Sequence, residues 1–184
     1  VESVIEEIQN GVNQYDVGFI DFEDENLSLD RRWFLKLLAE IKRRFSSNRL
    51  ELRAMNGLYP PSIDEEVIRS MQIAGFRTLN LSLGSADADQ LRHFNRPDVR
   101  AAFDRALGHA RGAKMTAVGY IIVCAPDQDP ETSVDDLLFL ARRRVLAGVS
   151  AFYPAPGSAD YQRCHAMGLL PTAFGAMRAT ALPI

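Results

Sequence analysis

The sequence predicts an α/β fold in which parallel strands form a partial, open barrel of the TIM-barrel type. Strand-then-helix units repeat five times between Asp16 and Ala166. Their strands begin near residues 17, 50, 77, 116 and 149, a spacing that matches βαβ units with right-handed crossovers. A closed barrel of eight units typically needs about 250 residues, whereas this chain has 184. We therefore expect a single domain over 1–184 that forms an incomplete ring.

A doubly wound parallel sheet is the alternative fold, and the third predicted strand helps to choose between the two. Leu79, Leu81 and Leu83 alternate there with Asn80 and Ser82. A doubly wound sheet is covered by helices on both faces, so polar side chains on one face would be costly unless they were hydrogen-bonded. A barrel with a polar ligand in its lumen accommodates them, and this favours the barrel.

Five segments combine apolar, β-forming residues with polar or Gly- and Pro-rich loops at their ends, as strands do. In the first of them Val17, Phe19, Ile20 and Phe22 are all apolar. The expected strands are Asp16–Phe22, Leu50–Ala54, Arg77–Leu83, Thr116–Cys124 and Val149–Tyr153.

Apolar residues recur at helical spacing in the segments before, between and after these strands. Ser62 and Glu65 make a capping box, and Asp98 is expected to cap the helix that follows it. Gly148 is expected to end its helix. The expected helices are 1–14, 30–45, 62–75, 86–94, 98–112, 132–148 and 159–167.

The chain opens at Val1 inside the first helix, with neither an initiator Met nor a strand before it. We therefore expect a fragment of a longer protein that lacks the first strand unit of its barrel. The strand that starts at Asp16 would then be an exposed edge strand with unpaired N–H and C=O groups. Self-association of two copies through this edge is the expected consequence.

Composition excludes several classes of protein. The chain is 47% hydrophobic and 24% charged, with a net charge of −3 and a pI near 5.6, so nothing suggests a nucleic-acid surface. No apolar stretch is long enough to span a membrane. Cys124 and Cys164 have no metal-ligand spacing and are too few for a disulfide framework. These features indicate a cytoplasmic protein without a nucleic-acid or membrane partner.

Polar or Gly- and Pro-bearing loops follow every predicted strand, at the end where a parallel barrel binds its ligands. Helix capping explains Ser28 and Asp30, which follow the first of these loops. It does not explain Glu23 or Asp24, which leave the strand directly. The loops cover residues 21–26, 53–57, 82–85, 124–126 and 153–158.

In order and spacing, four of these strand ends resemble segments of the radical S-adenosylmethionine (SAM) enzymes, particularly the subgroup whose barrel follows a cobalamin-binding domain. Residues 19–26 (FIDFEDEN) are similar to the family's second-strand segment. Residues 79–85 (LNLSLGS), with the downstream Arg96, are similar to its fourth-strand motif. Residues 119–126 (GYIIVCAP) and 152–158 (FYPAPGS) resemble its fifth-strand and sixth-strand motifs. The likeness covers most of the chain.

The resemblance implies that these strand ends hold SAM. Carboxylates such as Glu23 and Asp24 would lie near its ammonium and sulfonium, and the Arg96 guanidinium near its carboxylate. The implied SAM contacts are Glu23, Asp24, Asn26, Asn80, Ser82, Gly84, Ser85, Arg96, Ile122, Cys124, Pro126 and Tyr153.

The resemblance also implies what the full-length protein does. It would be an iron–sulfur oxidoreductase in which a [4Fe–4S] cluster reductively cleaves SAM to a 5′-deoxyadenosyl radical, which then attacks an unknown substrate. Membership of the subgroup would add cobalamin, bound by a separate domain.

Two features depart from the family's pattern. The three cluster-binding cysteines, spaced C-x3-C-x2-C, are absent, and Cys124 and Cys164 cannot replace them because three thiolates must converge on one cluster. Cys124 also stands where the family usually carries Gly. We therefore expect the fragment itself to be inactive, with the cluster cysteines just before Val1 in the longer protein.

Two other functions stay open. One is a non-catalytic barrel module that binds a small molecule or a partner, which fits the missing cysteines equally well. The other is a barrel lyase or hydrolase that uses Glu23 or Asp24 as a general base and needs no iron.

Overall fold

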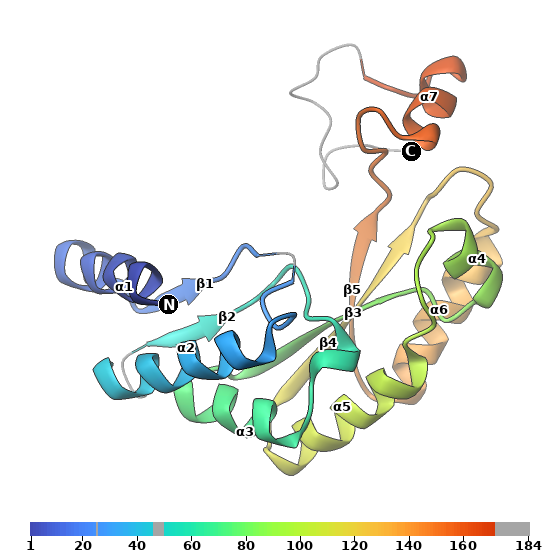
Figure 1. The fold of residues 1–184 in the computed structure, drawn as a ribbon. Coiled ribbons are helices and arrows are strands. Elements are labelled where there is room, and N and C mark those ends of the chain that lie inside the picture. Colours follow the sequence, from blue (N-terminus) through green and yellow to red (C-terminus); the bar gives the residue numbers. More distant parts are fainter. Residues whose placement is uncertain (25, 46–49, 172–184) are drawn as a thin grey trace. The chain divides into compact units, whose positions relative to one another are not determined.

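The computed structural model describes residues 1–24, 26–45 and 50–171. Contacts divide the chain into two compact units: Val1–Leu83 with Val99–Gly119, and Gly84–Asp98 with the described residues from Tyr120 onward. The chain is an α/β protein with parallel strands in open sheets (Figure 1). A single domain over residues 1–184 stays a prediction.

The first unit alternates strands and helices after an N-terminal helix. Its elements are α1 (Glu2–Tyr15), β1 (Phe19–Asp21), α2 (Arg31–Arg44), β2 (Glu51–Arg53), the 3-10 helix η1 (Pro60–Ser62), α3 (Glu65–Ala74), β3 (Thr78–Gly84), α5 (Arg100–Gly112) and the first half of β4 (Thr116–Val123). The second unit holds the last residue of β3 and the second half of β4. Its other elements are α4 (Ala88–His93), α6 (Pro130–Arg142), β5 (Leu146–Ala151) and α7 (Ala159–Ala166). None of the helices within the described residues is long and apolar enough to cross a membrane.

The strands of the first unit are parallel. β1 pairs with β2, and isolated parallel bridges join Leu52 of β2 to Phe76 and Leu58 to Leu81 of β3. β3 is next to β4 in a sheet of order β3-β4-β5. Parallel strands have their carboxyl ends at the same edge, so the loops after β1 and β2 emerge on the same side.

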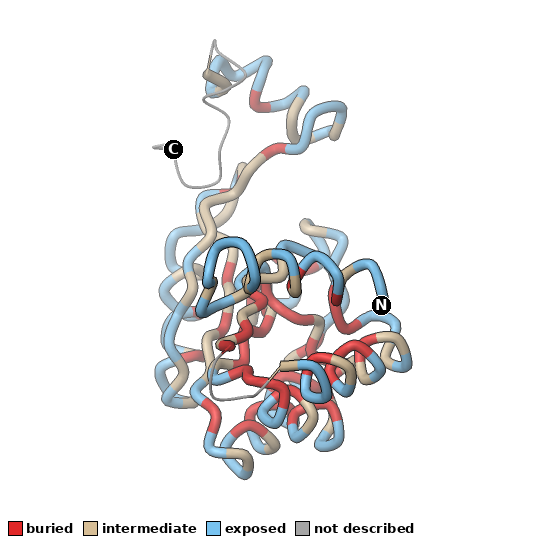
Figure 2. Tube along the Cα trace, turned by 90° about the vertical axis from the view of Figure 1, so that its left-hand side faces the viewer, coloured by how far each residue is buried: buried red, intermediate tan, exposed pale blue. Residues whose placement is uncertain are grey.

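Helices α2, α3 and α5 lie next to one another and cover one side of these strands (Figure 1). Phe34 of α2, Phe103 of α5 and Phe76 before β3 are buried there, and Phe34 meets Phe76 edge to face with ring centroids 6.5 Å apart. Buried residues, red in Figure 2, gather between the helices and the strands of this unit. Burial of each large apolar side chain stabilises this packing by about 1.5–3 kcal/mol.

In the second unit, the end of β4 pairs with β5, and the Phe152 amide donates to the Val123 carbonyl oxygen over 2.7 Å. Phe152 also stacks on Phe94, which follows α4, with ring centroids 6.2 Å apart. β5 has exposed apolar side chains, since Leu146 is 70% exposed and Val149 56%. The stack of Phe152 on Phe94 joins the residue after β5 to the segment after α4.

Most predicted elements are confirmed, but the helix expected over 132–148 and the strand expected over Val149–Tyr153 have wrong bounds. Helix α6 ends at Arg142, and Arg144 is left-handed with a φ of 54°. Gly148, the expected helix stop, lies inside β5. A Cβ at Gly148 would lie 2.4 Å from the Tyr120 ring, so packing within the sheet, not a helix end, requires glycine there.

Two predicted caps are also wrong. Helix α3 begins after Asp64, whose side chain accepts a hydrogen bond from the Val67 amide, whereas Ser62 lies in η1. The N-cap residue of α5 is Val99 and not Asp98. Spacing along the sequence does not distinguish the residue that caps a helix from a neighbour one or two positions away.

Gly148→Ala is expected to destabilise the second unit, because the added methyl group overlaps the Tyr120 ring. Overpacking of this kind costs about 1–3 kcal/mol. Gly108→Ala is the matched control: open space surrounds Gly108 in α5, so alanine there should stabilise the chain by about 0.5–1 kcal/mol. Urea unfolding followed by circular dichroism measures the free energy of unfolding of both variants. A Gly148→Ala variant as stable as the wild type would contradict the close packing of Gly148 against Tyr120.

We propose that copies of the chain associate through β1. This strand pairs with β2 on one side, and within the described residues no strand pairs with its other side. Phe19 in β1 is 54% exposed. Light scattering at rising concentration should show self-association that Phe19→Lys reduces, because a charge blocks edge pairing. Val134→Lys, at an exposed position of helix α6, is the control, and a wild-type chain that stays monomeric would overturn the proposal.

Candidate functional site

In the first unit, hydrogen bonds tie the loop after β1 to the loop after β2. The Asp21 carboxylate accepts from the Met55 amide over 3.2 Å, and the Asn56 side-chain amide donates to the Glu23 carbonyl oxygen over 2.9 Å. Glu23 and Asp24 are exposed at this end of β1. The two loops thus form one surface that carries carboxylates.

Asp24 shapes its own loop, because its carboxylate accepts from the Asn26 amide over 2.7 Å. Both residues are exposed, and Glu25 between them lies outside the described residues. The acidic segment predicted from the sequence is therefore present at the end of β1, where solvent and a cationic group can reach it.

Asn80 and Ser82 lie in β3, whose alternation agrees with the sequence. Leu79 and Leu81 are fully buried, Asn80 is 6% exposed and Ser82 is half-buried. The Leu58 amide donates to the Asn80 carbonyl oxygen over 2.8 Å, and the Ser82 amide donates to the Leu58 carbonyl oxygen over 2.9 Å. The segment after β2 is therefore fixed beside the two predicted residues.

In the second unit, Gly84 ends β3 in a left-handed conformation with a φ of 79°. A Cβ on Gly84 would lie 3.4 Å from Cδ of Arg96 and 3.7 Å from Cδ2 of Leu91, so the Arg96 side chain lies directly against this turn. The Arg96 amide also donates to the Leu91 carbonyl oxygen over 2.9 Å. Three predicted site residues, Gly84, Ser85 and Arg96, are thus close together at the end of β3.

Asp136 of α6, which the sequence did not single out, contacts the loop after Gly84. Its Oδ1 accepts from the Ser85 hydroxyl over 3.0 Å and from the Ala86 amide over 2.5 Å. Asp136 is fully buried, and its Oδ2 has no hydrogen-bond partner among the described residues. Nothing in the sequence separates this buried carboxylate from its exposed neighbour Asp135.

Burial raises the pKa of Asp136 above the ordinary value of 3.8, because the charged carboxylate loses its hydration. The hydrogen bonds from Ala86 and Ser85 lower it in part, and the charges of Asp87 and Asp135 raise it further. The folded chain therefore binds this proton more tightly than the unfolded chain does. The contribution of Asp136 to the free energy of unfolding is fully present below about pH 3.8, the pKa of the unfolded chain. It is lost as the pH rises through the higher pKa of the folded chain.

The loop after β4 contains two non-glycine residues in the left-handed region, Cys124 with a φ of 63° and Asp127 with a φ of 60°. The Gln128 side chain holds this loop: its Oε1 accepts from the Ala125 amide over 2.9 Å, and its Nε2 donates to the Ile122 carbonyl oxygen over 3.0 Å. The conformation of Cys124 is one that glycine adopts without strain, which is the physical reason that glycine suits this position.

A small apolar cavity of about 60 Å³ lies beside this loop in the second unit. It is lined by Cys124, Ala125, Pro126, Phe152, Pro154, Cys164, Leu169 and Leu170. Two predicted site residues, Cys124 and Pro126, are therefore neighbours there, whereas Tyr153 does not line the cavity. Cys164 is buried, and burial raises the pKa of its thiol, so it is a packed and unreactive group.

Each unit carries part of the predicted site. The first unit holds Glu23, Asp24, Asn26, Asn80 and Ser82. The second unit holds Gly84, Ser85, Arg96, Ile122, Cys124, Pro126 and Tyr153. A single ligand site made by both sets stays a prediction.

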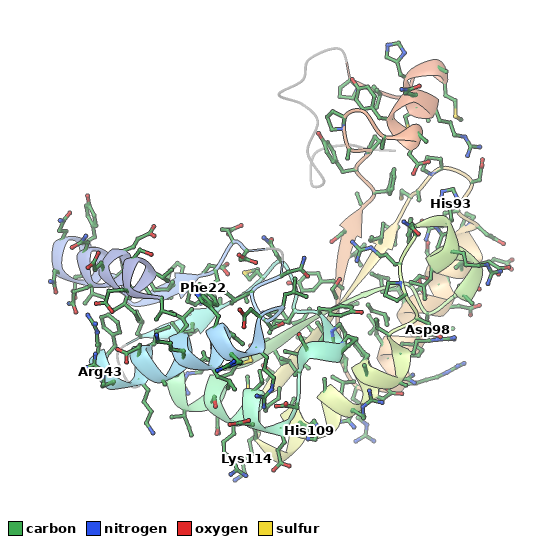
Figure 3. The ribbon with its side chains drawn as sticks, viewed as in Figure 1. Phe22, Arg43, His93, Asp98, His109 and Lys114 are labelled. Atoms are coloured by element: carbon green, nitrogen blue, oxygen red, sulfur yellow. The ribbon has the colours of Figure 1, made fainter. Side chains whose placement is uncertain are left out.

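The residues of this chain do not fit a [4Fe–4S] cluster. Two cysteines supply one thiolate fewer than the three that such a cluster needs when one iron is left open for SAM. Within the described residues, no group of three or more His, Cys, Asp or Glu side chains could hold a metal ion. His93 lies on α4 and His109 on α5, in different units (Figure 3).

Three solved structures are similar to this one. The radical SAM methyltransferase TsrM from Kitasatospora setae, with cobalamin and a [4Fe–4S] cluster bound, has a TM-score of 0.74 at 20% identity over 95% of this chain and 35% of its own. Methylornithine synthase (PylB) has a TM-score of 0.65 at 16% identity over 86% of this chain and 46% of its own. Coproporphyrinogen III oxidase (HemN) from Escherichia coli, a radical SAM enzyme, has a TM-score of 0.62 at 17% identity over 100% of this chain and 42% of its own. The chain has a radical SAM fold.

This radical SAM fold also has a relative in sequence. The anaerobic magnesium-protoporphyrin IX monomethyl ester cyclase of Cereibacter sphaeroides is 26% identical over 133 residues, which are 71% of this chain and 21% of the cyclase. No protein-family model matches the chain. The resemblance predicted from four motifs is confirmed, and the chain spans a fifth of its curated relative and about a third of TsrM.

Asp136→Asn is expected to raise the free energy of unfolding near neutral pH. The amide keeps an acceptor for Ser85 and Ala86 and removes a buried charge. The gain over the wild type should shrink as the pH falls to about 3.8, because Asp136 is then protonated as well. Urea unfolding at a series of acidic and neutral pH values measures this gain in the free energy of unfolding. Asp135→Asn, at the exposed neighbouring position, is the control. A gain of equal size at every pH would contradict the burial effect.

Proposed function

We propose that this chain is the SAM-binding part of a longer radical SAM iron–sulfur enzyme that starts radical chemistry on a small-molecule substrate. The observation that carries the proposal is the grouping of Gly84, Ser85 and Arg96 at the carboxyl end of β3, in a chain with a radical SAM fold. Parallel barrels bind their ligands at this end. The same three residues belong to the motif on which the resemblance rests.

The chemistry of SAM fits side chains of the second unit. The Arg96 guanidinium in the second unit suits its carboxylate, because both groups are planar and oppositely charged. In the first unit, taken by itself, the exposed Glu23 and Asp24 offer carboxylates to a cationic group. Ile122 and Pro126, in the second unit, offer apolar surface for adenine.

A [4Fe–4S] cluster would supply the electron that cleaves SAM, and we place its three cysteines in the longer protein, outside these 184 residues. The two-cysteine count and the coverage of only 35% of TsrM support this placement. The chain's own part is to bind and orient SAM, and by itself it is inactive. We assign cobalamin to a separate domain of the longer protein, on the likeness to TsrM, whose structure contains it.

A second candidate function is a non-catalytic module that binds a small molecule or a partner. The count of two cysteines favours it, because it needs no cluster. It predicts that the longer protein also lacks the C-x3-C-x2-C motif. The lyase or hydrolase hypothesis has less support, because Glu23 and Asp24 are exposed and not held in a water-excluded site.

Arg96→Ala is expected to weaken the binding of SAM by about 10- to 100-fold, the size expected for the loss of a hydrogen bond between charged groups. Titration calorimetry with SAM measures the dissociation constant. Arg96→Lys keeps the charge but not the planar fork, so its affinity should lie between those of the wild type and Arg96→Ala. Arg92→Ala, an exposed residue of α4 paired with Asp89, is the matched control and should bind as the wild type does.

Two results would count against the proposal: a wild-type chain that does not bind SAM, and an Arg96→Ala variant that binds it as tightly as the wild type. SAM binding together with a longer protein that lacks the cysteine motif would favour the non-catalytic module instead.

A further inference from the structure

Asp136 connects two parts of the second unit that are distant in sequence, helix α6 and the loop between β3 and α4. Its Oδ1 holds the Ser85 hydroxyl and the Ala86 amide of that loop. Ser85 in turn accepts from the Asp87 amide over 3.0 Å. The Asp87 carboxylate accepts from the Gln90 amide over 2.7 Å and so caps α4. A continuous series of hydrogen bonds therefore runs from Asp136 to the first turn of α4.

This arrangement costs stability. Asp136 is fully buried, and its Oδ2 has no hydrogen-bond partner among the described residues. An unpaired buried polar atom costs about 1–3 kcal/mol, and a charged one more. An apolar residue on this face of α6 would avoid that cost but would leave the Ser85 hydroxyl and the Ala86 amide without their acceptor. Local features that oppose stability are expected where a conformation serves function.

This loop adjoins two residues of the candidate site, Gly84 and Arg96. The loop begins at Gly84, whose left-handed turn lies against the Arg96 side chain. Ser85 is fully buried, so it acts on the site through the backbone it holds and not as an exposed ligand contact. Without an anchor on α6, residues 85–87 would be free to leave the position that keeps Gly84 beside Arg96.

We propose that Asp136 is a positioning residue: it holds residues 84–87 in the conformation that keeps Gly84 and Arg96 together, and thereby sets the affinity of this loop for SAM. Only the identity of the ligand rests on the function proposed above. The hydrogen bonds that Asp136 accepts from the loop, and their effect on the loop's mobility, are independent of the proposed function.

Four variants separate the hydrogen bonds from the charge. Asp136→Ala removes the acceptor of both donors, whereas Asp136→Asn keeps an acceptor oxygen and removes only the charge. Ser85→Ala removes one of the two bonds and leaves the carboxylate in place, so the test remains possible if Asp136→Ala does not fold. Asp135→Ala removes an exposed carboxylate from the same turn of α6 and is the matched control.

Hydrogen exchange of the Ala86 and Asp87 amides, measured by NMR without ligand, reports on the loop directly. Asp136→Ala should speed the exchange of both amides by about tenfold or more, while amides in the middle of α5 keep their rates. Ser85→Ala should speed the exchange of the Asp87 amide, which loses its acceptor. Asp136→Asn should stay within about threefold of the wild type, and Asp135→Ala should match it.

The affinity for SAM, measured by titration calorimetry, should follow the same order. Asp136→Ala should weaken binding by about tenfold, and Asp136→Asn should restore most of it. Unchanged exchange at Ala86 and Asp87 in Asp136→Ala, or equal losses of affinity in the alanine and asparagine variants, would overturn the inference. A wild-type chain that binds no SAM would instead overturn the proposed function, and the exchange rates would still decide whether Asp136 holds the loop.

Discussion

The left-handed turn at Gly84 is the constraint on which the candidate site depends. With a φ of 79°, this position favours a residue without a side chain, and a Cβ there would lie 3.4 Å from Arg96. The turn ends β3 and starts the segment that caps α4 and returns to Arg96. A buried carboxylate from α6, Asp136, accepts hydrogen bonds from the start of that segment. The Arg96 side chain thus lies against a turn whose next residues are hydrogen-bonded to α6.

Side-chain hydrogen bonds also hold the other loop ends. In the first unit, Asn56 after β2 donates to the Glu23 carbonyl oxygen and so fixes the start of the acidic loop. In the second unit, Gln128 bonds to both sides of the turn at Cys124, where the backbone is left-handed. Loops that are fixed before a ligand arrives bind it with a smaller loss of conformational entropy.

Local pattern was enough to predict much of the fold and the residues of the motifs. The alternation of leucines with Asn80 and Ser82 predicts β3, and the motif alone indicates Gly84. The boundary between α6 and β5 was missed because the reason for Gly148 is the ring of Tyr120, a contact that sequence spacing does not reveal. The sequence does not indicate Asp136 either. Its role depends on burial, and only the packing of α6 against the loop after β3 determines that burial.

The most direct measurement is made on a longer protein that contains this chain, reconstituted with iron and sulfide without oxygen. Electron paramagnetic resonance of the reduced protein is recorded before and after SAM is added. We predict the signal of a [4Fe–4S] cluster that changes with SAM and that Arg96→Ala makes insensitive to the same SAM concentration. A protein that forms no cluster, or a cluster whose signal is indifferent to SAM, would contradict a radical SAM function for this chain.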